Sequence, residues 1–458
     1  MNPPDPSPDS EETPSVALPV ARALRTRQST GQEMIYMAGA GAVALVLLVV
    51  FAVAWLGGPS MLHMLNKVQD AAVQPKRLQP PPPLTSEQHA ALSKFGQELA
   101  RSINTRNISK LAAQVDDEAL SARVLEKLPD AFEEPGVRAK LADILRGSSG
   151  TWMLQTMGGE AEYVRSRSRE DFPTVLLRTG RGWENYVDVM VRPEGEGFRV
   201  VDAFSHVEAR TASDEICHTL ASAARDPDSA AVASLPGMPP DASQEVLRQL
   251  PDYLVALRAR TALEQLQFCD ALPQDAQKVP LFFSLRLQVL QRLNTVNGWE
   301  NAGDYKAALR AAPGILGPDC TADLLLADVL RMENDFAGVD ECLKRAALAI
   351  GGADSHLTFR RADNCLIMRN HFQALALLDL VAKDPAWAKR AADLRIKIYL
   401  DQRDYPALVE TLRAFKNDFG VALGRHNYFV RMDVGEFLAS PEFLAWEKET
   451  TTGGVEPR

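Results

Sequence analysis

The sequence predicts a multidomain chain: a single transmembrane helix, then an α+β domain, then an all-α solenoid of paired helices. Three observations predict this order. Residues 34–56 contain no charged side chain and no proline, the hydrophobic period changes to two between residues 151 and 206, and nothing from residue 211 onward has the pattern of a strand. A period of two is typical of strands and a period near 3.6 of helices, so these stretches predict different folds.

Residues 34–57 form the predicted transmembrane helix. The stretch from Met34 to Leu56 is long enough to cross a bilayer core, which takes about 20 apolar residues at a rise of about 1.5 Å each. Tyr36 and Trp55 stand near its two ends, where amphipathic rings favour the headgroup layer. A buried core helix is the less favoured interpretation, because such helices usually carry a polar face. A cleaved signal peptide is disfavoured because its apolar region is shorter and begins earlier.

The segments on either side of this helix are predicted to lack a fold. Residues 1–33 are rich in Pro, Ser, Asp and Glu, which predicts a disordered tail. Residues 58–84 contain four consecutive prolines, which favour a stiff polyproline II spacer.

The charges around the helix favour a cytoplasmic N-terminus, because the cations on the N-terminal side lie closer to it. They are Arg22, Arg25 and Arg27 before the helix, against Lys67, Lys76 and Arg77 after it. We therefore expect a single-pass inner (plasma) membrane protein anchored by residues 34–56. Its C-terminal bulk would lie outside the cytoplasm, which in a bacterium is the periplasm.

Residues 85–208 form the predicted α+β domain, and it begins with helices. Thr85 and Gln88 have the spacing of a capping box ahead of an amphipathic run that ends near Ile103. Further helices are predicted from about Ile108, over residues 119–127 and over residues 137–146.

A run of five short strands follows, separated by glycine-containing turns. Helices followed by a meander predict helices packed on one face of a curved antiparallel sheet. The predicted strands are Trp152–Met157, Glu162–Arg167, Thr174–Arg178, Tyr186–Arg192 and Phe198–Ser205.

This order of elements, together with the closing strand Gly197–Phe204, resembles the NTF2-like (cystatin-related) cone fold. The resemblance implies a cone that encloses a pocket in some members, and some members are enzymes or bind small ligands. Four polar residues lie on or near strands that would line such a pocket, and these are our candidate pocket residues: Tyr163, Asp188, Asp202 and His206.

Arg165, Arg167 and Arg169 alternate along one predicted strand. We interpret this row as a solvated edge that deters strand pairing. Binding of an anionic partner is the alternative.

Residues 211–448 are predicted to be a helical repeat domain, and residues 449–458 a disordered tail. A three-residue pattern that ends in an aromatic residue recurs in four places: Gly303–Tyr305, Asn334–Phe336, Asn370–Phe372 and Arg403–Tyr405. Its aromatic residues are 31, 36 and 33 positions apart (336−305, 372−336 and 405−372). The aromatic residues are Tyr305, Phe336, Phe372 and Tyr405.

These spacings scatter around 34 residues, so the region resembles tetratricopeptide (TPR) repeats. The resemblance implies helical pairs in which each aromatic residue wedges against the first helix of its pair. Val339, Leu375 and Leu408 replace the alanine that usually follows the turn, which makes a peptide groove of the usual kind doubtful.

The sequence contains none of the common catalytic or nucleotide-binding motifs, and its seven histidines include no pair at metal-ligand spacing. We therefore predict no catalytic residue, no cofactor and no metal. A net charge of −10 argues against nucleic-acid binding. The five cysteines show no CxxC; we interpret them as small apolar residues, with one or two disulfides as the alternative.

The predicted function is a non-catalytic, membrane-anchored scaffold that presents its helical repeats to protein partners. The alternative is small-ligand binding or enzymatic activity in the cone pocket. A third interpretation is a homo-oligomer assembled through the span, where Ala38 with Ala42 and Ala40 with Ala44 permit close helix contact.

Overall fold

The computed structural model describes residues 81, 83–127, 160–180, 185–223, 261–297, 302–425, 427–429 and 434–452. All of them belong to one compact unit, Val68–Arg458. Several predicted segments lie outside the described residues. They are the transmembrane helix, both disordered tails except residues 449–452, most of the spacer, the helix over 137–146 and the strand Trp152–Met157. None of the described helices is long and apolar enough to span a membrane.

The first described part is an α+β region built on a five-stranded antiparallel sheet in the order β1-β2-β3-β4-β5. This confirms the predicted meander; β5 was not predicted. The strands are β1 (Ala161–Arg169), β2 (Phe172–Thr179), β3 (Asn185–Glu194), β4 (Gly197–Ser205) and β5 (Arg210–Thr211). The helices beside them are α3 (Ser86–Asn104), α4 (Ile108–Gln114), α5 (Asp117–Lys127) and α7 (Ala212–Ala223).

Helix α3 begins with the predicted capping box. The Gln88 amide donates to Thr85 Oγ1 at 3.2 Å, and the Thr85 amide donates to Gln88 Oε1 at 2.9 Å. Two of the amides that a helix start leaves unpaired are thereby satisfied locally. This explains why the start of the helix was readable from four residues.

Helices cover both faces of the sheet, so the prediction of helices on one face was wrong. Helix α3 packs so closely on one face that a Cβ atom at Gly96 would lie 2.5 Å from the Tyr163 ring and 2.7 Å from Val175. On the other face, Leu176 and Tyr186 are buried in a hydrophobic cluster with helices of the C-terminal region. This second face of the sheet is therefore covered in part by the C-terminal helices of the same chain.

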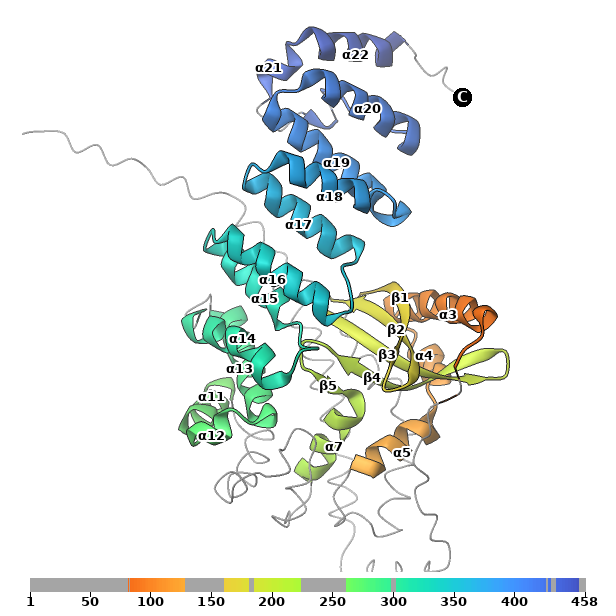
Figure 1. The fold of residues 1–458 in the computed structure, drawn as a ribbon, viewed down its shortest axis with the longest axis vertical. Helices are drawn as coiled ribbons and strands as arrows, with labels where there is room; N and C mark the ends of the chain where they lie inside the picture. The colour runs from red at the N-terminus through yellow and green to blue at the C-terminus, as the bar shows by residue number, and fades with distance from the viewer. Residues whose placement is uncertain are drawn as a thin grey trace, which may run out of the picture. The chain divides into compact units, whose positions relative to one another are not determined.

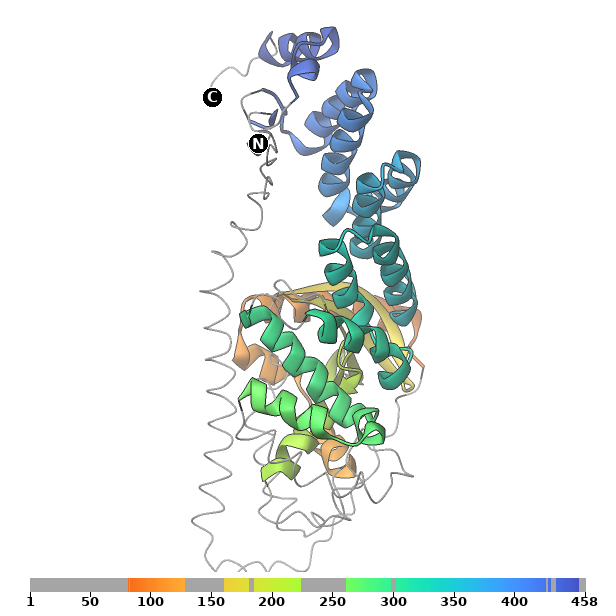
Figure 2. The same cartoon turned by 90° about the vertical axis from the view of Figure 1, so that its left-hand side faces the viewer.

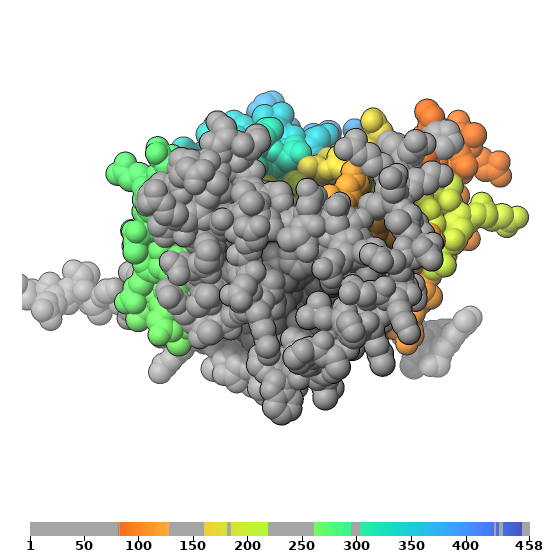
Figure 3. All heavy atoms as spheres, turned by 90° about the horizontal axis from the view of Figure 1, so that it is seen from below, coloured from red at the N-terminus to blue at the C-terminus, as the bar shows by residue number. Residues whose placement is uncertain are grey.

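The second described part is helical from Ala262 to Thr452. Successive helices from α15 to α20 contact one another in chain order and stack one after the next (Figures 1 and 2). Seen from below, α11–α13 (green) and α3–α5 (orange) lie on opposite sides (Figure 3). The helices are α11 (Ala262–Ala271), α12 (Gln274–Gln277), α13 (Pro280–Asn297), α14 (Ala302–Leu316), α15 (Ala322–Met332), α16 (Phe336–Ala349), α17 (Ser355–Ile367), α18 (His371–Val381), α19 (Pro385–Gln402), α20 (Tyr405–Phe419), α21 (Gly435–Leu438) and α22 (Pro441–Thr452).

One turn recurs between α15 and α16, α17 and α18, and α19 and α20. Its first defining residue has a left-handed backbone, with φ of 61° at Asn334, 57° at Arg369 and 57° at Arg403. The next residue is the N-cap of the second helix, and its amide donates to the carbonyl oxygen five residues earlier at 2.8–3.0 Å. The N-cap side chain accepts a hydrogen bond from the amide three residues later. The N-caps are Asp335, Asn370 and Asp404.

These N-caps are 35 and 34 residues apart (370−335 and 404−370), so they define a register for the three pairs. Phe336 and Tyr405 occupy the first helical position in their pairs, but His371 occupies it in α18. Phe372 lies one residue further on and is 87% exposed. The prediction that Phe372 wedges against the preceding helix was therefore wrong. It matched Phe372 with Phe336 and Tyr405, whereas the residue equivalent to these two in the structure is His371.

Of the other predicted turn aromatics, Phe336 and Tyr405 are half-buried and Tyr305 is buried. Tyr305 is buried within α14, and Tyr405 packs against Phe437 with ring centroids 5.4 Å apart. At the end of the stack, Phe443 and Trp446 are fully buried, as expected for a terminal cap.

Candidate functional site

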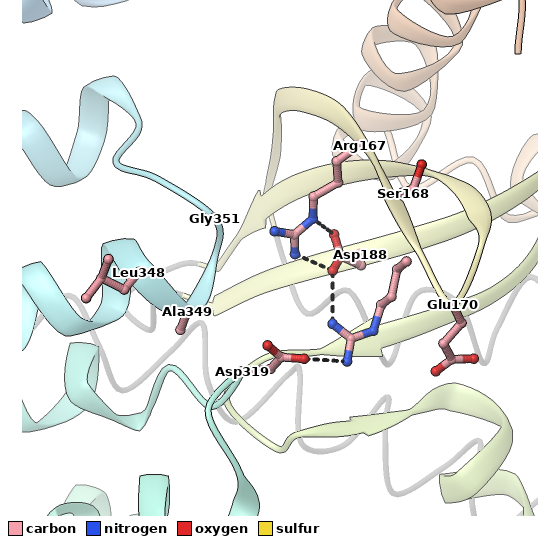
Figure 4. Close-up of a pocket in the computed structure, with 9 residues that line it drawn as sticks. Arg167, Ser168, Glu170, Asp188, Asp319, Leu348, Ala349 and Gly351 are labelled. Atoms are coloured by element: carbon pink, nitrogen blue, oxygen red, sulfur yellow. Dashed lines mark hydrogen bonds and ion pairs between the residues drawn. The ribbon is translucent and has the colours of Figure 1, made fainter. Parts of the chain in front are cut away.

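A cleft of about 410 Å³ lies where the sheet meets the helical region (Figure 4). Its walls come from β1 and the turn after it, from β3, from the loop between α14 and α15, and from the end of α16. The lining residues are Arg167, Ser168, Arg169, Glu170, Asp188, Asp319, Leu348, Ala349 and Gly351.

Asp188 of β3 is the centre of the polar network below the cleft and is fully buried. Arg167 of β1 binds both of its carboxylate oxygens, with 2.7 Å from Nε to Oδ1. His206 Nε2 lies 3.0 Å from Asp188 Oδ2, and Arg169 Nη1 lies 3.4 Å from the same oxygen. A buried carboxylate is tolerated when it is paired and hydrogen-bonded in this way.

The same contacts set the protonation state of Asp188. Burial alone would raise the pKa of this carboxyl group, but its hydrogen-bonded partners His206 and Arg167 outweigh burial and hold the pKa below its ordinary value. A carboxylate stabilised in its charged form is a poor proton acceptor near neutral pH. Asp188 is therefore suited to holding its neighbours in place.

His206 follows β4 and is also fully buried. Its Nδ1 lies 2.7 Å from the backbone carbonyl oxygen of Asp319, and because a carbonyl only accepts, Nδ1 donates. Its own amide donates to the Tyr186 carbonyl at 2.9 Å, and its carbonyl accepts from the Thr321 amide at 2.9 Å. His206 thus ties the sheet to the loop that precedes α15.

Arg169 binds the same loop through its side chain. Its Nη2 donates to Asp319 Oδ2 at 3.0 Å, and its guanidinium carbon lies 3.3 Å from the centroid of the Phe204 ring. The Arg169 guanidinium thus joins Asp319 of the loop to Asp188 of β3.

Arg165 and Arg167 bind the end of α16, so the interpretation of this row as a solvated edge was wrong. Both donate to the Ile350 carbonyl oxygen, at 2.7 and 2.6 Å, and Arg165 also donates to that of Gly352 at 2.6 Å. The last carbonyls of a helix are unpaired and carry partial negative charge, so they attract cations. β1 is the outermost of the described strands on this side of the sheet, and the face that carries the arginines is covered.

The structure brings together two of the four candidate pocket residues, Asp188 and His206. Tyr163 lies on the α3 side, where its hydroxyl is 3.0 Å from Ser93 Oγ. Asp202 is buried at another place, 2.7 Å from Arg123 Nε and 2.6 Å from Ser213 Oγ.

Sequence reasoning missed Asp319 altogether. It follows Gly317-Pro318 in a loop, and no motif marks it. Arg167 was singled out, but its bond to Asp188 depends on the pairing of β1 and β3 with the intervening β2. Only the register of those strands could have predicted that Arg167 binds Asp188.

All five cysteines are buried and free of disulfides. Burial raises the pKa of Cys320 to about 11 and that of Cys342 to about 12, which keeps both thiols protonated. Within the described part of the chain, no group of His, Cys, Asp and Glu side chains is placed to hold a metal ion.

Comparison of the chain with known protein families, curated proteins and solved structures finds no match.

Proposed function

We propose that this chain is a non-catalytic, membrane-anchored scaffold that presents TPR-like helical repeats to protein partners, in the periplasm if its source is a bacterium. Anchoring through residues 34–56 is supported by the length and the uncharged composition of that stretch. The NTF2-like domain would then act as a base that joins the spacer to the repeats.

The recurring turn carries the proposal. Three helical pairs share a left-handed residue, an N-cap and the same hydrogen bonds, at intervals of 35 and 34 residues (370−335 and 404−370). The TPR period is about 34 residues. Stacked pairs of this kind make a long surface from local contacts, which suits the binding of other proteins.

The NTF2-like assignment is supported by the helices that precede the five-stranded meander. The contacts at its second face favour a structural role for Asp188 and His206. The Asp188 carboxylate is engaged by Arg167, Arg169 and His206, and His206 Nδ1 is engaged by the Asp319 carbonyl of the α14–α15 loop. In our proposal these residues position the repeats.

The test is photo-crosslinking in intact membranes, with a topology reporter fused to each end of the full chain. Crosslinkers are placed at exposed positions of α15–α20 and, as matched controls, on the exposed side of α3. We expect crosslinked proteins from the helical positions alone, a cytoplasmic N-terminus and an external C-terminus. Full-length protein in the soluble fraction, or crosslinks only from α3, would refute the proposal.

Deletion of residues 211–458 is a poor test, because it would expose Leu176 and Tyr186, which pack against the deleted helices. Point changes on the surface keep that core intact and are preferred.

The cleft supports a second candidate function, the binding of a small ligand. Its volume of about 410 Å³ falls within the range of ligand pockets, about 300–1,000 Å³. Native mass spectrometry of the purified protein tests it: a bound small molecule that is lost in Ser168→Trp would favour this function, and unliganded protein throughout would reject it.

A further inference from the structure

The outward face of α18 is apolar although it is exposed. We define this face by Phe372, Ala376 and Leu380, which follow one another at intervals of four residues and so lie on one side of the helix. Phe372 is 87% exposed and Leu380 56% exposed, and Ala376 is also exposed. Asp379, seven residues after Phe372, borders this face and is exposed, and its carboxylate is engaged by Arg395. Neighbouring apolar side chains that are exposed together mark an interaction surface.

The equivalent of Ala376 in the neighbouring helical pairs is a charged residue exposed to solvent. Counted from the N-cap, the residue six positions on is Glu341 in α16 and Glu410 in α20, and both are exposed. The equivalent residue in α18 is Ala376. At this position the pairs on either side of α18 therefore carry an exposed acid, whereas α18 carries an alanine between the exposed Phe372 and Leu380, which favours an interaction surface there.

The charges around this face are unbalanced. Arg369, just before α18, and Lys383, just after it, are both exposed and pair with no other described residue. The nearby acids are engaged: Asp379 binds Arg395, and Asp401 lies 2.6 Å from His371. An occupant with negative charge at both ends would complement this pattern.

A second copy of the chain fits poorly. An antiparallel pair of α18 helices crossing at Ala376 would bring Arg369 of one copy near Lys383 of the other. A parallel pair would bring each cation near its own equivalent. Like charges would meet in both arrangements, and such contacts weaken association.

We propose that the outward face of α18 binds an amphipathic helix of another protein, whose apolar stripe is flanked at both ends by Asp or Glu. The interval of four residues matches the ridges by which helices pack, and the face from Phe372 to Leu380 spans about 12 Å, or two turns. This inference rests on the proposed scaffold function and names its surface and partner class.

A photo-reactive benzoylphenylalanine at position 376 of the full chain, activated in intact membranes, tests the proposal. We expect an adduct whose peptide has apolar residues at intervals of three or four and acids at both ends. The matched control is the same residue at position 341 of α16, where we expect no adduct of this kind. An adduct with lipid, with a second copy, with residues 1–80 of this chain or with a peptide that lacks the acids would overturn the proposal, as would the absence of an adduct.

The charges are tested separately. The double variant Arg369→Glu with Lys383→Glu should lower the yield of the position-376 adduct at least tenfold, whereas Lys397→Glu on α19 should leave it unchanged. An equal yield in both would reject the role of the two cations. The scaffold function fails if no position on α15–α20 yields a protein adduct or if the full chain stays in the soluble fraction, so its failure is distinguishable from the failure of this inference.

Discussion

The junction between sheet and helices is held together differently from the helical stack. We call the junction the network of the three β1 arginines, Asp188 and His206, together with its contacts to the α14–α15 loop and the end of α16. The hydrogen bonds from this network to those two segments join residues 113 to 187 positions apart along the chain. The turns of the stack are closed by hydrogen bonds between residues three to five positions apart.

This difference predicts how strongly a single substitution should lower the stability of each part. A junction built on one buried carboxylate concentrates its stability in a few residues, because removing one partner leaves the others buried and unpaired. A stack built from repeated local turns spreads its stability over many small contributions. The predictions below test this contrast.

Replacing the central carboxylate should have the largest effect. Asp188→Ala leaves Arg167 half-buried without its bidentate partner and should lower the free energy of unfolding by about 3–5 kcal/mol. Urea unfolding followed by circular dichroism measures it. Asp379→Ala, which removes an exposed ion pair on α18, is the control and should cost at most about 1 kcal/mol. Similar losses in the two variants would contradict the contrast.

The close packing of α3 on the sheet should reverse the usual effect of an alanine. Gly96→Ala places a Cβ atom against Tyr163 and Val175 and should destabilise by about 1–3 kcal/mol. Gly314→Ala in α14, where nothing lies within 4 Å, should stabilise by about 0.5–1 kcal/mol. Thermal unfolding measures both changes in stability. A stabilised Gly96→Ala variant would mean that α3 lies further from the sheet.

The junction should also show in the acid dependence of stability. Because the folded-state pKa of Asp188 is lowered, its pairing stabilises the fold above the ordinary carboxyl pKa of about 4 and is lost as the pH falls through the lowered value. The difference in unfolding free energy between wild type and Asp188→Asn should therefore shrink below about pH 4, by at most about 1.4 kcal/mol per pH unit. A difference that is constant from pH 3 to 7 would refute this sign.

Loss of one local cap should have the smallest effect. Asn370→Ala removes the hydrogen bond to the Gln373 amide and should cost about 1 kcal/mol. Asn370→Asp keeps an acceptor and should be close to neutral. Hydrogen exchange of the first amides of α18 localises the effect, and a loss as large as that of Asp188→Ala would show that the turns are not independent.

Much of the fold was predictable because it rests on local patterns. The strand around Val187 and the helix start at Thr85 have periods and caps that lie within ten residues of one another. The turn between α17 and α18 shows the limit: an aromatic residue was expected at the first helical position of α18, and His371 stands there instead. The N-cap was the better marker, because its hydrogen bonds define the turn.

The site was predictable only in part. Asp188 and His206 were chosen for their chemistry, and the pairing of β3 with β4 brings them together. Tyr163 was chosen on the same grounds but faces α3, since a bulge in β1 between Tyr163 and Arg165 changes which side chains share a face.

By itself the sequence determined the four longer strands of the described sheet and located the turns of three helical pairs to within one residue, because these features depend on neighbours a few residues away. Only the tertiary structure decided that arginines of β1 lie against the end of α16 and that a loop aspartate reaches the sheet. Those contacts depend on how separately formed elements pack, and no local period or cap encodes the partner of a side chain more than a hundred residues distant.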